Sequence, residues 1–195
     1  MCPGFFHILL ISSKFCAIII SGSYRIVRSI MVLYHGSTIT VQTPEIRTSK
    51  TFLDFGNGFY TTTSYHQAHR WAMIKMRREN LSTAFVSVYD FDFEKAVQSL
   101  IIKKFDTADS EWLDFVSANR RGEQLFDCCD MHIGPVADDN IYQTIRLFET
   151  GILSASETVK RLKTEVLHDQ WTFHTEQALA HCHYRECIVI TGGRK

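Results

Sequence analysis

Residues 31–37 read Met-Val-Leu-Tyr-His-Gly-Ser, and residues 54–63 read Asp-Phe-Gly-Asn-Gly-Phe-Tyr-Thr-Thr-Thr. The first stretch is apolar as far as His35, which predicts a short strand over 32–35, followed by a polar loop over 38–50. The second has a Gly-Asn-Gly turn before aromatic and β-branched residues, which predicts a strand over 58–63. These two strands are the part of the sequence that decides the fold.

A helix is predicted directly after them. Ser64 is a typical N-cap residue, and a helix over 65–80 places apolar residues at helical spacing. Further strands are predicted over 83–93, 97–105, 130–136, 170–174 and 186–191, the third of them broken at Gly134-Pro135. Further helices are predicted over 109–118, 140–149, 155–164 (after a capping box at Ser154) and 175–182. Strands at both ends with helices mostly between them favour an α+β fold over a doubly wound parallel sheet.

The composition is that of an ordinary globular protein. The chain has 195 residues, 45% apolar and 22% charged, with a formal net charge of zero. This length favours one domain, and the absence of net charge gives no electrostatic argument for a nucleic acid or membrane partner. None of the six cysteines forms a Cys-x-x-Cys pair, so we interpret them as reduced thiols of a cytoplasmic protein.

The first thirty residues differ from the rest. They carry Lys14, Arg25 and Arg28 but no acid, and Lys14 interrupts an apolar run. A secretory signal would place its positive charge before that run, and a membrane helix would need about twenty uninterrupted apolar residues. Our hypothesis is that Met31 is the true start, that 1–30 is an erroneous or dispensable extension, and that 31–195 is the single domain. A native mass beginning at Met1 would refute it.

Three segments are candidates for chemistry: residues 34–37, 55–60 and 169–173. Each one alone has an ordinary interpretation. A single histidine at a strand end is more often structural than catalytic, a Gly-Asn-Gly sequence is more often a tight turn than a phosphate-binding loop, and Tyr60 and Trp71 could be core aromatics.

Together and in this order, the segments resemble a known group. His35-Gly36-Ser37 at the end of one strand and Gly58-Phe59-Tyr60 opening another are similar to the nicotinamide-binding half of the poly(ADP-ribose) polymerase branch of ADP-ribosyltransferases. This resemblance covers about 32–76 and 168–190. Trp71 matches the branch's second aromatic residue, Ala68 matches its small residue, and Gln170 stands where the branch has a glutamate. Most of 31–190 also resembles a bacterial family of unknown function, number 3990, described as ADP-ribosyltransferase-like.

The resemblance implies a split β-sheet core and a set of roles. Gly36 would pair its backbone with the carboxamide of NAD, and Ser37 would support the same end. His35 would hydrogen-bond a ribose hydroxyl of the adenosine side. Tyr60 and Trp71 would hold the nicotinamide ring between two aromatic faces, which suits a flat ligand. NAD would be the substrate, and no metal is expected.

Gln170 departs from the pattern because an amide can hydrogen-bond a ribose hydroxyl but cannot act as a base. Asp169 would face away from it on a strand, and Glu176 is a weaker substitute. We therefore expect transfer of one ADP-ribose unit to a protein or nucleic acid, by a toxin or regulatory enzyme. A small neighbouring gene that must be co-expressed would point to a toxin with an antitoxin as its partner. Hydrolysis of NAD, non-catalytic binding of NAD or ADP-ribose, and a purely structural role remain alternatives.

Two other groups of residues have ordinary interpretations. The tail holds potential metal ligands, but their spacing fits no zinc signature. They are His174, His181, Cys182, His183 and Cys187. The basic pairs Lys103-Lys104 and Arg120-Arg121 could contact phosphates, although a solvated charged surface explains both.

Overall fold

A computed structural model of the chain describes residues 9–10, 16–20, 23–26, 30–48, 53–123, 128–136, 139–163 and 167–192. The strands are β1 (Leu9–Leu10), β2 (Cys16–Ile20), β3 (Ser23–Ile26), β4 (Ile30–Ser37), β5 (Phe59–Thr61), β6 (Thr83–Asp92), β7 (Ile102–Lys104), β8 (Met131–Pro135), β9 (Asp169–Phe173) and β10 (Cys182–Thr191). The helices are α1 (Tyr65–Arg78), α2 (Phe93–Ser99), α3 (Ser110–Arg120), α4 (Asp139–Glu149), α5 (Ala155–Leu162) and α6 (Glu176–Leu179).

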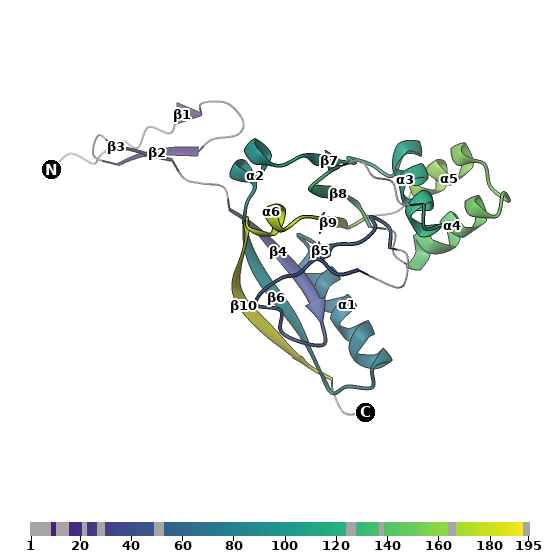
Figure 1. Ribbon diagram of the computed structural model, residues 1–195, viewed down its shortest axis with the longest axis horizontal. Helices are drawn as coiled ribbons and strands as arrows, with labels where there is room; N and C mark the ends of the chain where they lie inside the picture. The colour runs from purple at the N-terminus through teal and green to yellow at the C-terminus, as the bar shows by residue number, and fades with distance from the viewer. Residues whose placement is uncertain are drawn as a thin grey trace.

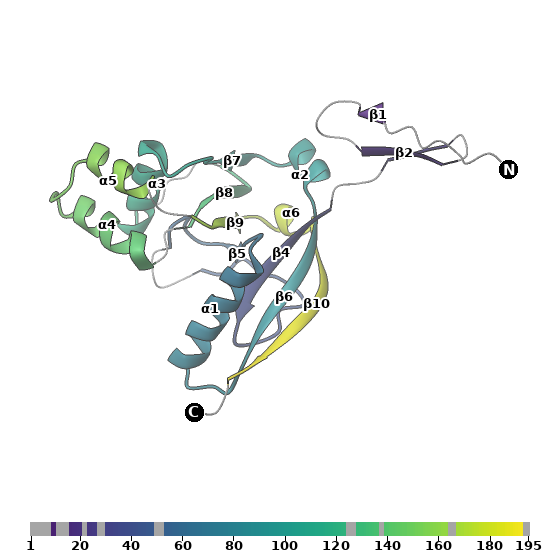
Figure 2. The same ribbon diagram turned by 180° about the vertical axis from the view of Figure 1, so that it is seen from behind.

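Two sheets form the body of the molecule (Figures 1 and 2). One has the strand order β10-β6-β4 and is antiparallel throughout. The other has the order β5-β9-β8-β7 and is antiparallel except for the β7–β8 pair. Strands β1, β2 and β3 form a separate third sheet. Antiparallel sheets with helices outside them confirm the predicted α+β class.

The main core lies where the two large sheets face each other. Leu33 of β4 pairs with Tyr89 of β6, and both side chains pack against Phe59, Trp171 and other apolar residues of the second sheet. The alternate residues of β4 and β6 point the other way and pack under α1. Both faces of β4 and β6 are therefore covered, which fixes the register of the strands that carry the site.

Helices α3, α4 and α5 pack together in a second hydrophobic cluster with Phe55 and Phe105. Both ribbon views place these three helices on the far side of the molecule from the β10-β6-β4 sheet. The predicted caps are confirmed: Ser64 accepts from the Gln67 N–H, and Ser154 forms a capping box with Glu157. In the described residues, no helix is long and apolar enough to cross a membrane.

The predicted strand over 97–105 is wrong for its first half. The side chain of Asp92 accepts a hydrogen bond from the Lys95 N–H and thereby starts α2, which runs to Ser99, so that only Ile102–Lys104 is strand. A capping aspartate followed by a short helix outweighed the β-branched Val97.

The predicted break in the strand at Gly134-Pro135 is also wrong, because β8 runs through both residues. The Val136 N–H donates to His168 on the β9 side, so the nitrogen of Pro135 faces the β7 side, where β7 has already ended opposite Ile133. The missing donor therefore costs no ladder hydrogen bond. The predicted last helix is shorter than expected, since β10 already begins at Cys182.

Candidate functional site

The two large sheets meet where β4 touches β5. Tyr34 and Thr62 exchange two backbone hydrogen bonds, of 2.8 Å and 3.0 Å. A continued antiparallel ladder would next pair Gly36 with Tyr60. Instead, side chains take both carbonyls: His35 Nδ1 lies 2.6 Å from the Tyr60 carbonyl, and Lys75 Nζ donates to the Gly36 carbonyl at 2.9 Å. The ladder opens at this point, which we call the β4–β5 opening.

The position of His35 fixes its protonation. A carbonyl only accepts, so Nδ1 carries the proton and the neutral ring presents Nε2 as an acceptor. The ring also stacks on Phe59, with ring centroids 4.7 Å apart. Burial lowers the pKa of His35 to about 4, helped by the positive charges of Lys75 and Arg47 and opposed by the hydrogen bond to Tyr60. His35 is therefore neutral near pH 7 and can accept a hydrogen bond from a hydroxyl group.

The lowered pKa of His35 gives a testable pH dependence of stability. In the unfolded chain its pKa is near 6.5, so between that value and about 4 the unfolded state binds a proton that the folded state does not. We expect the unfolding free energy of the wild type, relative to that of His35→Gln, to fall by at most about 3 kcal/mol as pH drops through this range. Urea denaturation of both proteins at several pH values measures it, and a constant difference would contradict the assignment.

At Gly36, β4 lies directly against the backbone of α1. A Cβ at this position would lie 2.0 Å from the Ala68 carbonyl oxygen and 2.9 Å from the Ala72 nitrogen. Gly36, Ser37 and Ala68 are all buried, and the Ser37 hydroxyl accepts from the Ile39 N–H at 3.4 Å. These three residues, predicted to share the ligand site, do lie close together.

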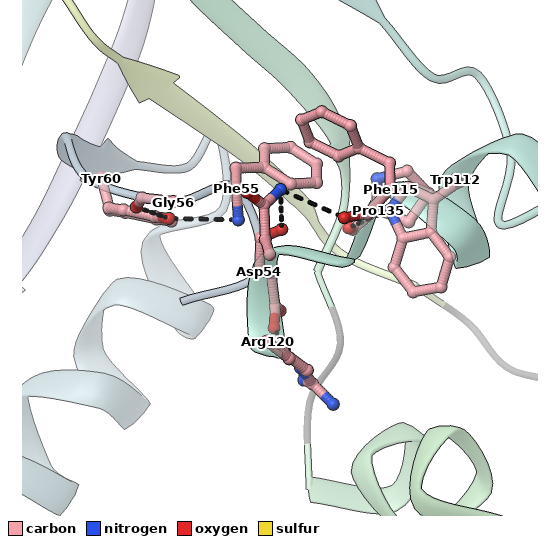
Figure 3. Close-up of polar contacts among 9 residues, drawn as sticks. Asp54, Phe55, Gly56, Tyr60, Trp112, Phe115, Arg120 and Pro135 are labelled. Atoms are coloured by element: carbon pink, nitrogen blue, oxygen red, sulfur yellow. Dashed lines mark hydrogen bonds and ion pairs between the residues drawn. The ribbon is translucent and has the colours of Figure 1, made fainter. Parts of the chain in front are cut away.

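Tyr60 is held by the turn before it (Figure 3). Its hydroxyl donates to the Gly56 carbonyl at 2.6 Å and accepts from the Phe55 N–H at 3.2 Å. Burial, followed by the charge of Asp54, raises the pKa of the phenol, so it stays protonated. Asp54 in turn forms an ion pair with Arg120 of α3 at 2.7 Å. The ring of Tyr60 is thus fixed by a network that reaches a distant helix.

Trp71 is partly exposed on α1, and among the described residues no ring contact joins it to Tyr60. It lines a cleft with a volume of about 80 Å³, between α1 and the start of β9. The other lining residues are His66, Gln67, Arg70, Ile74, Val136 and His168. The Oε1 atom of Gln67 is buried and has no hydrogen-bond partner in the described part of the chain. Trp71 therefore provides an aromatic wall beside a residue with an unsatisfied acceptor.

Gln170 lies in β9, two residues after the cleft residue His168. Tyr60 pairs with Thr172 in the sheet, so Gln170, two residues from Thr172, shares a face with Tyr60 and with the cleft residue His168. Its side chain is 5% exposed, and its Nε2 has no hydrogen-bond partner among the described residues. An unpaired buried donor destabilises a fold by about 1–3 kcal/mol. A ligand oxygen bound here would remove that penalty.

The two acids considered as substitutes for a glutamate have other positions. Asp169 accepts from the Trp171 indole at 2.6 Å, from the Thr62 and Thr63 hydroxyls and from the Thr63 N–H, so both its oxygens are used. It shares its face with Trp171 and points away from Gln170, as predicted. Glu176 is exposed in the first turn of α6.

His174 of the tail and the basic pairs make structural contacts. His174 lies between His132 and the carbonyl of Asn57, at 2.9 Å and 2.6 Å. Within the described ranges, no three potential ligands gather to hold a metal, and Cys128, Cys182 and Cys187 form no disulfide. The basic pairs end in ion pairs, namely Lys103–Glu111, Lys104–Asp106, Arg120–Asp54 and Arg121–Glu123.

Sequence reasoning missed Lys75, Arg47 and Gln67. Lys75 follows Ala68 by seven residues, which puts both on one face of α1, and that spacing was the available signal. Nothing in the sequence around Arg47 distinguishes it from a residue of a polar loop.

Comparisons with known proteins give one match. No curated protein and no solved structure matches the chain. A family model described as "Protein of unknown function (DUF3990)" matches residues 31–184, which include the β4–β5 opening, α1 and β9. The chain belongs to this family, DUF3990.

Proposed function

We propose that the protein is an NAD-dependent mono-ADP-ribosyltransferase that modifies a protein or nucleic acid. The observation that carries this proposal is the β4–β5 opening, where His35 presents an acceptor nitrogen beside the backbone of Gly36. The family model matches the segment but describes no activity. Of the residues that resemble the polymerase branch, His35, Gly36 and Tyr60 border the opening, Ala68 packs on Gly36, and Trp71 lines the cleft.

The proposed roles follow from the groups that each residue presents. Gly36 directs its N–H and carbonyl into the opening, as Tyr34 does two residues earlier, and these groups suit a carboxamide. His35 Nε2 accepts from a ribose hydroxyl. Ser37 and Ala68 border the nicotinamide end, and Tyr60 and Trp71 contribute aromatic surface to it.

The reaction breaks the bond between nicotinamide and C1′ of the ribose. Nicotinamide leaves with the electron pair, positive charge develops on the ribose, and an acceptor oxygen or nitrogen bonds to C1′ and loses its proton. Gln170 Nε2 can donate to the neighbouring 2′-hydroxyl oxygen and orient the ribose. Because Gln170 bears no charge, repeated transfer to form a chain is not part of the proposal.

One observation favours a non-catalytic module for NAD or ADP-ribose instead. Asp169, the acid next to Gln170 in the sequence, points away and has both oxygens occupied, so it supplies no charge beside the ribose. Such a module would use the same residues to bind the dinucleotide without cleaving it.

Labelled NAD distinguishes these functions. The full chain is incubated with NAD labelled on the adenosine side and a cell lysate, with His35→Ala as the control. Label on macromolecules supports transfer, free ADP-ribose alone supports hydrolysis, and binding without turnover supports the module. If the folded protein binds neither NAD nor ADP-ribose, all three are refuted.

A further inference from the structure

The cation inside the β4–β5 opening is the ammonium of Lys75. Ala68, Ala72 and Lys75 lie on the face of α1 that packs on β4, and the close contact at Gly36 brings the helix near enough for Lys75 to reach the strand. Its Nζ donates to the Gly36 carbonyl, which is the group that a carboxamide would use. In the ligand-free protein, Lys75 therefore occupies part of the proposed nicotinamide site.

The surroundings of Lys75 are positively charged. Burial lowers its pKa, and the charge of Arg47 lowers it further, while Glu79 acts in the opposite direction. Lys75 and Arg47 also both lower the pKa of His35, so the three groups are within electrostatic range of one another. Among the described residues, no carboxylate lies within ion-pair distance of Lys75 or Arg47. A half-buried ammonium within electrostatic range of an exposed guanidinium, with no described carboxylate in ion-pair contact with either, is a site that attracts an anion.

We propose that Lys75 and Arg47 bind the diphosphate of the dinucleotide, and that Lys75 leaves the Gly36 carbonyl when it does so. The identity of this anion rests on the proposed function, whereas the attraction of the site for an anion does not. An ammonium binds a phosphate more strongly than a neutral carbonyl, and the flexible stem of lysine allows the ammonium to move between them. Binding of the diphosphate would then free the Gly36 carbonyl for the carboxamide, so one half of the ligand prepares the site for the other.

Titration of the full chain with three probes tests this. The probes are inorganic pyrophosphate, ADP-ribose and nicotinamide, which separate the anion from the neutral ring. The variants are Lys75→Met, Lys75→Gln and Arg47→Gln. Lys75→Gln keeps a donor for the Gly36 carbonyl and guards against loss of folding. Arg77→Gln is the matched control, because it removes one exposed charge from the same helix.

We expect dissociation constants for pyrophosphate and ADP-ribose to rise about tenfold or more in both Lys75 variants and in Arg47→Gln, and to stay unchanged in Arg77→Gln. Nicotinamide should bind Lys75→Met at least as tightly as the wild type, because the carbonyl is free. A purely structural lysine would instead weaken all three ligands together, in step with a lower melting temperature, and that result overturns the proposal. Wild-type affinity in the variants would also overturn the proposal, as would a folded wild type that binds neither pyrophosphate nor ADP-ribose.

The proposed anion site and the proposed transferase activity can fail independently in these experiments. If Lys75-dependent binding of pyrophosphate is found but NAD is never cleaved, the transferase proposal fails and the anion site stands. If NAD is cleaved while the variants bind ADP-ribose normally, the anion site alone fails.

Discussion

Replacing Gly36 with alanine is expected to lower the free energy of unfolding by about 3 kcal/mol or more. The new methyl group would lie 2.0 Å from the carbonyl oxygen of Ala68, far inside contact distance. The opposing atoms are helix backbone, which cannot rotate away as a side chain can. Neither element can retreat without loss, because β4 is paired along its length with β6 and α1 is packed on both strands.

Chemical denaturation of the full chain measures this effect, and Gly151→Ala is the control. Gly151 follows α4 with φ of +75°, and a Cβ there would meet nothing within 4 Å. Its replacement should destabilise by about 1–2 kcal/mol, the backbone cost of a left-handed conformation alone. Similar losses for the two variants would show that the contact between β4 and α1 is looser than the structure has it. A surviving Gly36→Ala protein should also bind NAD poorly, because the opening would widen.

Much of this arrangement could be predicted from the sequence, because the signals are local. The apolar run before His35, the turn before Phe59 and the capping Ser64 each lie within a few residues of the element they determine. The prediction missed helix α2 because two local signals overlap there. Asp92 ends an alternating strand and also caps a helix, and the pattern of the strand concealed the cap.

The site was predicted less completely, since its groups meet through tertiary contacts. The resemblance placed His35 and Tyr60 in one site, but their link runs through the Tyr60 carbonyl and depends on where the β4–β5 ladder opens. By residue type, Lys75 reads as a solvated lysine on an amphipathic helix. Only the close packing at Gly36, which allows α1 to approach β4, brings its ammonium into the opening.

Replacing Gln170 with alanine is expected to reduce kcat/KM for NAD cleavage roughly 10²–10³-fold, the usual effect of removing one well-placed donor. Its Nε2, which is unpaired among the residues that the structure describes, is the group available to orient the ribose. The loss should disappear with an NAD analogue that lacks the 2′-hydroxyl of the nicotinamide ribose, because the donor then has no partner to lose. An equal loss with the analogue would mean that Gln170→Ala acts through the fold. Asp169→Asn is the neighbouring control, and we expect it to reduce stability more than turnover, since the partners of Asp169 among the described residues are Thr62, Thr63 and Trp171.

Gln170→Glu is the opposite test, because it supplies the negative charge that Gln170 lacks. A carboxylate at this position would stabilise the positive charge that develops on the ribose, so turnover should rise about tenfold or more above the wild type. The same carboxylate would be buried without a partner in the free protein, and the melting temperature should therefore fall. Faster turnover in a less stable protein is the combination that only a role in the reaction explains. A variant that loses stability and gains no turnover, while NAD binding is kept, would favour the non-catalytic module, because the developing charge that a glutamate stabilises would then never form.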